Sequence, residues 1–249
     1  MTDIPIAWIR PGSVPRFPPP AQALREPDGL LALGGDLAPP RLLAAYRHGI
    51  FPWYGPEEPI LWWSPDPRCV FHTDAVHVSR RLRRQLRQCA WTVTIDQAFT
   101  EVMQRCAAPR AGQGGGTWIV DDMLDAYTTL HRQGHAHSIE VWDGKRMVGG
   151  LYGVAVGRLF CGESMFSEVS GGSKAALVCL AALLQRWNMP LLDAQVGNGH
   201  LYRMGAMDMS RDAFLDQLAL LASAQPDAGA FRLDDPLPVA AFMEGAGAA

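Results

Sequence analysis

The segment Ser138-Ile-Glu-Val-Trp-Asp-Gly144 indicates the fold class of this chain. Asp-Gly after a run of strand-forming residues is the strongest short signal for a β-hairpin, because its tight turn needs residues that tolerate positive φ. A second strand-like run, residues 147–156, follows this turn, and Gly157-Arg158 then leads into residues 159–166. We therefore predict an antiparallel meander of three strands.

Helices and further strands are predicted on both sides of the meander from the spacing of apolar residues. They are a strand at 91–95, helices at 97–106 and 121–133, a helix from Ser170 that Pro190 breaks, a strand at 191–196 and a helix at 210–222. Helices segregated around an antiparallel meander are typical of an α+β domain. The fold class predicted is α+β with a mostly antiparallel sheet.

The N-terminal quarter has a different character. Residues 1–40 are rich in proline, so little regular structure is expected there. Residues 41–47 predict a short helix closed by Gly49. Residues 53–63 hold three tryptophans and a tyrosine, interrupted by prolines. This aromatic segment is either a plug between two domains or a platform for stacking. We predict a small domain at 1–66 and a larger one at 67–249.

Composition sets the class of protein. Hydrophobic residues make up 48% of the 249 residues and charged ones 19%, which supports a large core and excludes global disorder. The net charge of −3 argues against bulk attraction to nucleic acid, although basic residues can gather locally. Five cysteines without a Cys-x-x-Cys pair favour reduced thiols. With neither a leader nor a run of about 18 apolar residues, we expect a soluble cytoplasmic protein without membrane contact.

One helix is strongly basic. Ser79 is a suitable N-cap for residues 80–87, and the arginines at i, i+3, i+4 and i+7 share one face. They are Arg80, Arg83, Arg84 and Arg87. Four arginines on one face repel one another unless an anion neutralises them, so phosphate contact is a candidate role. A solvated surface helix is the alternative.

Asp193 and Gln195 are polar residues in an otherwise apolar strand. Two residues apart on a strand, they should point to the same face, with Ala194 turned the other way into packing. Their Cα atoms should be roughly 6.5–7 Å apart. An Asp that holds a Gln amide is a plausible positioning pair. A capped strand end is the alternative.

Glu163 follows Gly162 where another strand is expected to end, just before Met165 and Phe166. A carboxylate among apolar neighbours suits a cationic ligand, and a salt bridge to an arginine is the alternative. The apolar residues around these polar groups could line a cavity or belong to the core. They are Met165, Leu177, Leu180, Leu184 and Leu192. His135 and His137 lack a third ligand, so no metal is expected. A Cys161 nucleophile and a catalytic His200 lack supporting motifs.

Seven motifs together resemble one family. They are Gly34-Gly-Asp36, Gly49-Ile-Phe-Pro-Trp53, Trp62-Trp-Ser-Pro-Asp-Pro-Arg68, Gly116-Thr-Trp-Ile119, Gly134-His-Ala-His-Ser-Ile-Glu-Val-Trp142, Gly162-Glu-Ser-Met-Phe-Ser167 and Asp193-Ala-Gln-Val196. Through them, residues 20–220 resemble the leucyl/phenylalanyl-tRNA–protein transferases, bacterial enzymes that add Leu or Phe to proteins beginning with Arg or Lys. The resemblance implies a small N-terminal domain plus a C-terminal domain like the GCN5-related N-acetyltransferases.

The resemblance also implies a role for each matched residue. The terminal adenosine of the tRNA would be held by Tyr46, Trp53 and Trp118, and the aminoacyl side chain by a pocket of Met165, Leu177, Leu180 and Leu192. Glu163 would receive the cationic side chain of the acceptor's N-terminal residue, and the catalytic pair would be Asp193 and Gln195. The arginine helix would contact the acceptor stem of the tRNA. Leu180 stands where a relative has a bulkier aromatic, which leaves the pocket size open. The implied enzyme needs no cofactor, acts as a monomer, and marks proteins for degradation.

The implied reaction is aminolysis of an ester by an α-amine. An α-amino group has a pKa of about 7.7–8.0, so roughly a tenth is neutral at pH 7 without a base. The enzyme therefore needs orientation more than basicity. A Gln amide is a poor proton acceptor, so we interpret Gln195 as aiming the amine and Asp193 as holding Gln195. The final proton acceptor is left open.

Two other functions fit parts of the pattern. An acyl-CoA-dependent N-acyltransferase would share the order of meander, helix and strand, with a pyrophosphate at residues 170–173. The usual Gln/Arg-x-x-Gly-x-Gly/Ala loop is absent there. A non-catalytic RNA-binding protein would use the aromatic segment and the arginine helix, but it leaves Glu163, Asp193 and Gln195 without a role.

Overall fold

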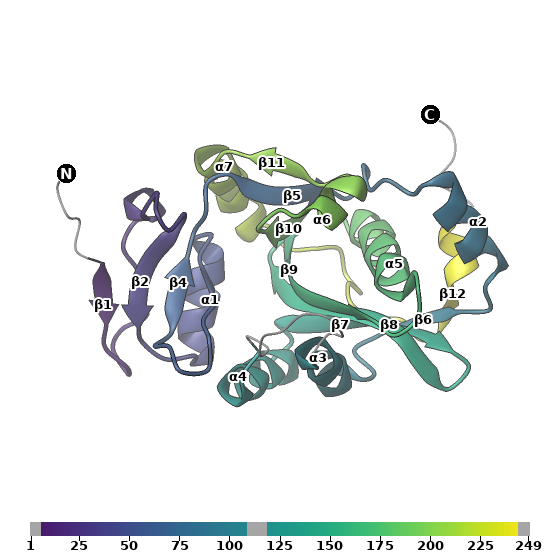
Figure 1. The fold of residues 1–249 in the computed structure, drawn as a ribbon, viewed down its shortest axis with the longest axis horizontal. Helices are drawn as coiled ribbons and strands as arrows, with labels where there is room; N and C mark the ends of the chain where they lie inside the picture. The colour runs from purple at the N-terminus through teal and green to yellow at the C-terminus, as the bar shows by residue number, and fades with distance from the viewer. Residues whose placement is uncertain (1–5, 109–118, 244–249) are drawn as a thin grey trace.

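Two sheets lie side by side in the computed structural model, which describes residues 6–108 and 119–243 (Figure 1). The smaller sheet has four strands in the order β1-β2-β4-β3. They are β1 (Ala7–Ile9), β2 (Leu30–Gly34), β3 (Phe51–Pro52) and β4 (Leu61–Trp63). Helix α1 (Pro39–Arg47) lies beside this sheet, and a short 3-10 helix, η1 (Pro20–Gln22), precedes β2. Regular structure thus forms in the proline-rich region where little was expected.

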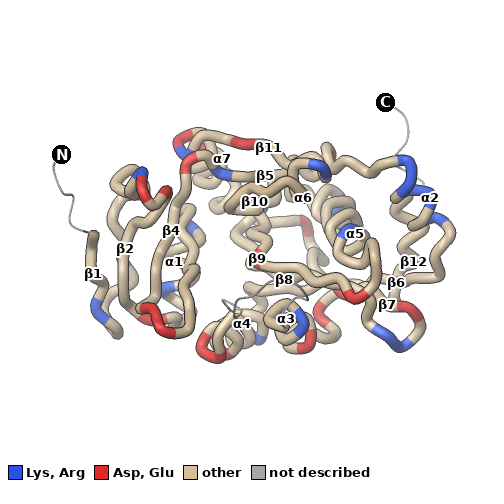
Figure 2. The backbone as a smooth tube through the Cα atoms, in the orientation of Figure 1, with Lys and Arg blue, Asp and Glu red and all other residues tan. Residues whose placement is uncertain are grey.

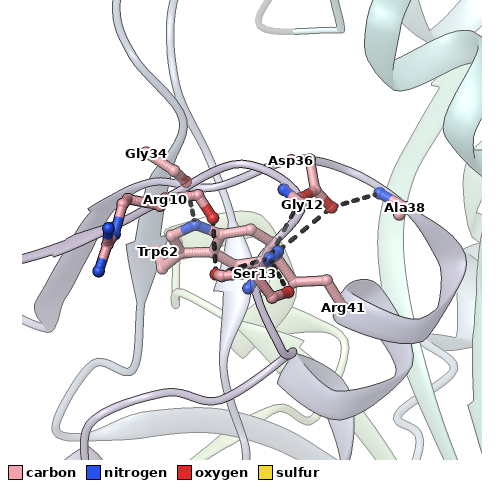
Figure 3. A network of polar contacts seen from close by, with 8 residues as sticks. All are labelled: Arg10, Gly12, Ser13, Gly34, Asp36, Ala38, Arg41 and Trp62. Carbon is pink, nitrogen blue, oxygen red and sulfur yellow. Dashed lines mark hydrogen bonds and ion pairs between the residues drawn. The ribbon is translucent and has the colours of Figure 1, made fainter.

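A polar network ties the first residues to α1 (Figure 3). Asp36 accepts a hydrogen bond from the backbone N–H of Gly12 at 2.7 Å and pairs with Nη2 of Arg41 at 3.1 Å. The same Nη2 donates to the carbonyl oxygen of Ser13 at 2.8 Å. The hydrogen bond from Arg41 lowers the pKa of Asp36. A buried arginine with these partners fixes a segment that has few ladder hydrogen bonds of its own.

The larger sheet has eight strands in the order β11-β5-β10-β9-β8-β7-β6-β12. They are β5 (Arg68–His72), β6 (Thr92–Ile95), β7 (Ala136–Asp143), β8 (Arg146–Val156), β9 (Leu159–Ser167), β10 (Leu191–Gln195), β11 (Met207–Met209) and β12 (Leu237–Pro238). All neighbouring pairs are antiparallel except β9 and β10, which run parallel. The predicted meander is β7-β8-β9, and Gly144 turns its first hairpin with φ of 58°.

Helices cover both faces of the larger sheet (Figure 1). Helices α3 (Phe99–Ala107) and α4 (Asp121–Arg132) lie on one face, and α5 (Gly172–Arg186) lies on the other. Side chains alternate accordingly along β8, because Tyr152 packs in the core with α3 and α4 whereas Leu151 packs in the core with α5. Gly149 of β8 lets α5 begin close by, since a Cβ there would lie 2.3 Å from the backbone of Gly172.

Residues 237–243 pack in the same hydrophobic core as α5. After α7 (Arg211–Ala222), the chain returns as β12 and a 3-10 helix, η2 (Val239–Met243), beside α2 (Arg80–Gln88). Val239, Phe242 and Met243 are all buried. The sequence indicated only a tail rich in alanine and glycine here, because so few apolar residues are too short a run for a periodic pattern.

The predicted α+β fold with a mostly antiparallel sheet is confirmed. The chain passes from one sheet to the other between Trp63 and Arg68. One hydrophobic core nevertheless joins residues of both, with Tyr46 and Trp62 in the same cluster as Phe99 and Phe214. The division into domains at 1–66 and 67–249 stays a prediction, as does the likeness to N-acetyltransferases. The glycine-rich loop at 111–116 lies outside the described residues.

None of the helices in the described ranges is long and apolar enough to cross a bilayer.

Candidate functional site

The parallel strands β9 and β10 separate toward their C-terminal ends. Their pairing covers only Leu191 to Asp193 of β10, with Asp193 opposite Cys161. Beyond this point β9 has lost that neighbour, and a cavity of about 410 Å³ lies at the opening. The N-terminal sheet contributes Phe51, Pro52 and Trp53 to its wall. The site is therefore built where the two sheets meet, and its volume suits one small ligand group.

One wall of the cavity is apolar. Leu177 and Leu180 lie three residues apart on α5 and so share a face, while Met165 and Leu192 come from β9 and β10. All four residues expected to line a pocket are thus brought together. Leu184, the remaining apolar candidate, is a core residue with no exposed surface. Phe71, Leu151 and Leu201 extend the same wall.

Glu163 enters the cavity from a β-bulge. The register between β8 and β9 shifts so that Tyr152 pairs with Ser164 and Gly153 with Gly162, which leaves Glu163 as the extra residue. A bulge re-aims its side chain out of the regular alternation. The Glu163 carboxylate accepts a hydrogen bond from Nε2 of Gln195 at 2.9 Å. Burial raises its pKa to about 7, although nearby hydroxyl and amide donors counteract this.

Two tyrosines support Glu163 from the side of α1 and α4. The hydroxyl of Tyr127 donates to Oε2 of Glu163 at 3.2 Å, and it also bonds the hydroxyl of Tyr46. Both rings are buried, and burial raises both pKa values well above the usual range. Tyr46 was expected to hold an adenosine, but it presents no exposed ring face. Tyr127 was missed because its helical spacing is typical of a core residue.

Asp193 forms a buried ion pair that sequence reasoning missed. Nε and Nη2 of Arg68 donate to its two carboxylate oxygens at 2.8 Å and 2.7 Å, and both side chains are essentially inaccessible. Nη1 of Arg68 donates to the carbonyl oxygen of Gly49 at 2.9 Å. Asp193 is absent from the cavity wall, in contrast to Gln195. Such a bidentate pair fixes a carboxylate in one orientation.

The predicted alternation at the end of β10 is wrong. The register with β5 shifts between Asp193 and Gln195, and Gln195 adopts a left-handed φ of 57°. Ala194 packs against the core and also lines the cavity together with Gln195, so the two neighbours do not alternate. Asp193 contacts the backbone of Gln195, whose N–H donates to Oδ1 at 2.9 Å, rather than its side-chain amide. The amide is held by Glu163.

Cys161 and His200 gain no support as catalytic groups. Burial raises the pKa of the Cys161 thiol well above its ordinary value, so it is not a thiolate at neutral pH. Within the part of the chain that is described, no cluster of three His, Cys, Asp or Glu side chains could hold a metal ion.

The aromatic segment divides between core and cavity. Trp62 has no exposed surface and donates from Nε1 to the carbonyl oxygen of Gly34 at 2.8 Å. Trp53 is 45% exposed and lies in the cavity wall. Its backbone oxygen accepts a hydrogen bond from Nε1 of Trp63 at 2.6 Å. Trp62 is thus a core residue, and stacking by Trp53 stays a prediction. Trp118 lies outside the described residues.

Helix α2 carries the predicted arginine stripe (Figure 2). Its N-cap is confirmed, because Oγ of Ser79 accepts from the backbone N–H of Leu82, and Leu82 and Leu86 dock the other face. Arg87 donates to the carbonyl oxygen of Met243 at 3.1 Å. None of the ion pairs found among residues 6–108 and 119–243 includes an arginine of this helix.

Comparison with known proteins identifies one family. The family model described as leucyl/phenylalanyl-tRNA protein transferase matches residues 70–219, and the model for the N-terminal domain of that transferase matches residues 35–66. A leucyl/phenylalanyl-tRNA–protein transferase of Xanthomonas campestris pv. campestris strain B100 is 59% identical over 212 residues, or 85% of either chain. One of Xylella fastidiosa strain M12 is 58% identical over 82% of this chain and 84% of its own.

Similarity to solved structures is weak. The structure of L-PGS from Bacillus licheniformis aligns with 68% of this chain and 53% of its own, with a TM-score of 0.39 and 9% identity. A likeness at this level decides nothing about function.

Proposed function

The chain belongs to the leucyl/phenylalanyl-tRNA protein transferase family, and we propose that it moves Leu or Phe from aminoacyl-tRNA to proteins that begin with Arg or Lys. The family membership makes it an aminoacyltransferase. The observation that carries the finer proposal is the composition of the cavity. Apolar side chains form one part of its lining, and the Glu163 carboxylate bonded to the Gln195 amide forms another.

The apolar part of the lining suits the side chain of the donor. Leu, Phe and Met have unbranched Cβ atoms and can enter a pocket formed by Met165, Leu177, Leu180 and Leu192. Burying such a side chain contributes about 1.5–3 kcal/mol to binding. Trp53 at the wall is placed to stack on the terminal adenosine, and we assign the same role to Trp118. In this proposal Tyr46 does not stack on the adenosine. Its hydroxyl bonds that of Tyr127, which in turn donates to Glu163.

The polar part of the lining suits the acceptor. Glu163 would pair with the cationic side chain of an N-terminal Arg or Lys, and a neutral side chain would gain nothing there. Gln195 offers its amide oxygen to the attacking amine while its nitrogen is held by Glu163. Asp193 holds the backbone of Gln195 and does not face the cavity. We therefore treat Asp193 as a positioning residue.

The remaining features of the proposal concern the whole tRNA and the cell. The arginines of α2 would contact the acceptor stem, since basic residues that form no ion pair with any described residue attract phosphates. The product would be marked for degradation in the cytoplasm. The enzyme would act as a monomer without a cofactor.

Transfer assays with two donors test the reaction. Purified protein and a peptide beginning with Arg are offered leucyl-tRNA or an acyl-CoA. We expect a leucylated peptide from the first donor only. Acyl transfer from CoA without leucyl transfer would overturn the proposal in favour of an N-acyltransferase. Glu163→Gln should lose its preference for Arg over neutral N-termini, whereas Glu57→Gln, an exposed control, should keep it.

A further inference from the structure

Three basic residues belong to the two helices that also contribute residues to the cavity wall. Lys174 lies one helical turn before Leu177 on the same face of α5, and Leu177 is in the cavity wall. His200 and Arg203 belong to α6 (Gly199–Arg203), whose Leu201 is also in that wall. A Cβ at Gly199 would lie 3.3 Å from Nη1 of Arg203, so the guanidinium folds back over the start of α6.

These three groups are close enough to influence one another. Burial lowers the pKa of His200, and the charges of Lys174 and Arg203 lower it further. Arg203 is exposed, and the other two side chains are half-buried. No ion pair within the described ranges involves any of them. Lys174 and Arg203, which make no ion pair with any described residue, can attract an anion together.

Helix α2 contacts the segment that leads into the helix carrying Lys174. Nε2 of Gln85 in α2 donates to the carbonyl oxygen of Ser170 at 2.8 Å, two residues before α5 begins. Helix α2 therefore adjoins the end of α5 that carries Lys174, and Figure 2 shows basic segments on both helices. Basic residues thus occur on α2, at the start of α5 and on α6, and the last two helices also line the cavity.

We propose that Lys174, His200 and Arg203 bind the phosphates of the unpaired 3′ end of the tRNA, between its base-paired stem and its terminal adenosine. This inference rests on the proposed function, because it needs an adenosine in the cavity. A single strand leaving the cavity toward α2 passes these residues first. Lys174 and Arg203 supply charge, and neutral His200 supplies a ring N–H that can donate to a phosphate oxygen.

Three donors of increasing length can distinguish phosphate binding by these residues from binding of the adenosine or of the acceptor stem. They are leucyl-adenosine, which has no phosphate, a leucylated trinucleotide, which has two internal phosphates, and leucyl-tRNA. The variant carries Lys174→Gln and Arg203→Gln together. The matched control carries Lys145→Gln and Arg232→Gln, both exposed residues outside this cluster. Binding of the unacylated trinucleotide is measured alongside by fluorescence anisotropy.

We expect the double variant to raise KM about tenfold for the trinucleotide and the tRNA, with KM for leucyl-adenosine and kcat unchanged. The slope of log KM against log salt should fall by about 1.4 for the trinucleotide, or about 0.7 for each phosphate of a single strand. Replacing the α2 arginines should affect the tRNA but not the trinucleotide.

Two results would overturn the proposal: equal KM values for variant and control on the trinucleotide, or an equal rise for leucyl-adenosine. Absence of transfer from all three donors by wild-type protein would instead refute the proposed function. In that case, if the anisotropy measurement gave the variant and the wild-type protein the same Kd for the trinucleotide, the phosphate site would be rejected as well.

Discussion

The buried carboxyl group of Glu163 lowers the stability of the folded protein at neutral pH. Burial raises its pKa from the ordinary 4.5 to about 7, so between these values the folded chain binds more protons than the unfolded chain. The free energy of unfolding must then fall as pH rises through this window. A carboxylate retained under this penalty is typical of a functional site.

Glu163→Gln should therefore stabilise the protein at pH 8 relative to wild type, and much less at pH 5. Glutamine keeps an acceptor for Tyr127 and has no charge to desolvate. Melting temperatures of both proteins at both pH values check this, with the exposed Glu57→Gln as the control. A melting difference that does not depend on pH would contradict the raised pKa.

The same pKa sets a pH dependence for activity. Above about pH 7 Glu163 is ionised and, in its proposed role, can pair with the cationic side chain of an N-terminal Arg, whereas below about pH 7 its carboxyl group is neutral. KM for an Arg-peptide should therefore rise as pH falls from 8 to 6 in wild type. It should change far less in Glu163→Gln, apart from the ionisation of the peptide amine that both proteins share. Parallel KM profiles would exclude Glu163 from acceptor binding.

Variants of Arg68 and Asp193 can show whether Asp193 acts by holding the backbone of Gln195 or through its own negative charge. Asp193→Asn alone leaves a buried guanidinium unpaired, which should cost about 3–5 kcal/mol of stability. Arg68→Gln with Asp193→Asn removes both charges and keeps an oxygen for the Gln195 N–H. We expect this double variant to be more stable than Asp193→Asn and to have a higher kcat than it, with the remaining deficit from wild type due to the lost contact between Arg68 and Gly49. A folded but inactive double variant would show that the charge of Asp193 takes part in the reaction.

At the scale of elements, local signals predicted most of the fold. The Ser79 cap, the turn at Gly144 and the apolar face of α5 each depend on neighbours within a few residues. For the candidate site, the residue patterns left each role with a structural alternative, and only the resemblance to a family chose between them. Periodicity placed Asp193 and Gln195 on one face, whereas a register shift against β5 separates them. Arg68 was missed because its partner lies 125 residues away along the chain.

We expect helix α5 to control which donor side chain fits the cavity. Leu180 lies in the cavity wall with 1% of its surface exposed, so a larger residue there must project into the cavity. Leu180→Phe should reduce kcat/KM for phenylalanyl-tRNA more than for leucyl-tRNA. Leu180→Ala should shift the ratio the other way, because it enlarges the pocket. Rates with both donors and melting temperatures measure this. An unchanged ratio in both variants would place the donor side chain elsewhere.

At the scale of the whole molecule, the junction of the two sheets is part of the site. Gly49 ends the turn after α1 with φ of 71°, and a Cβ there would lie 2.7 Å from Leu215 of α7. Its carbonyl oxygen accepts from Arg68, which holds Asp193. The position of the N-terminal sheet is thereby linked to the backbone of Gln195.

Gly49→Ala tests this link, and Gly134→Ala is its matched control. Gly134 follows α4 with φ of 77° and has nothing within 4 Å of a Cβ. Both variants should lose about 1–2 kcal/mol of stability from the left-handed conformation. Gly49→Ala should lose about 1–3 kcal/mol more through the clash with α7. It should also lower kcat at temperatures where it is fully folded, because Arg68 loses its fixed acceptor, whereas Gly134→Ala should retain kcat. Equal kcat values would show that the junction only holds the sheets together.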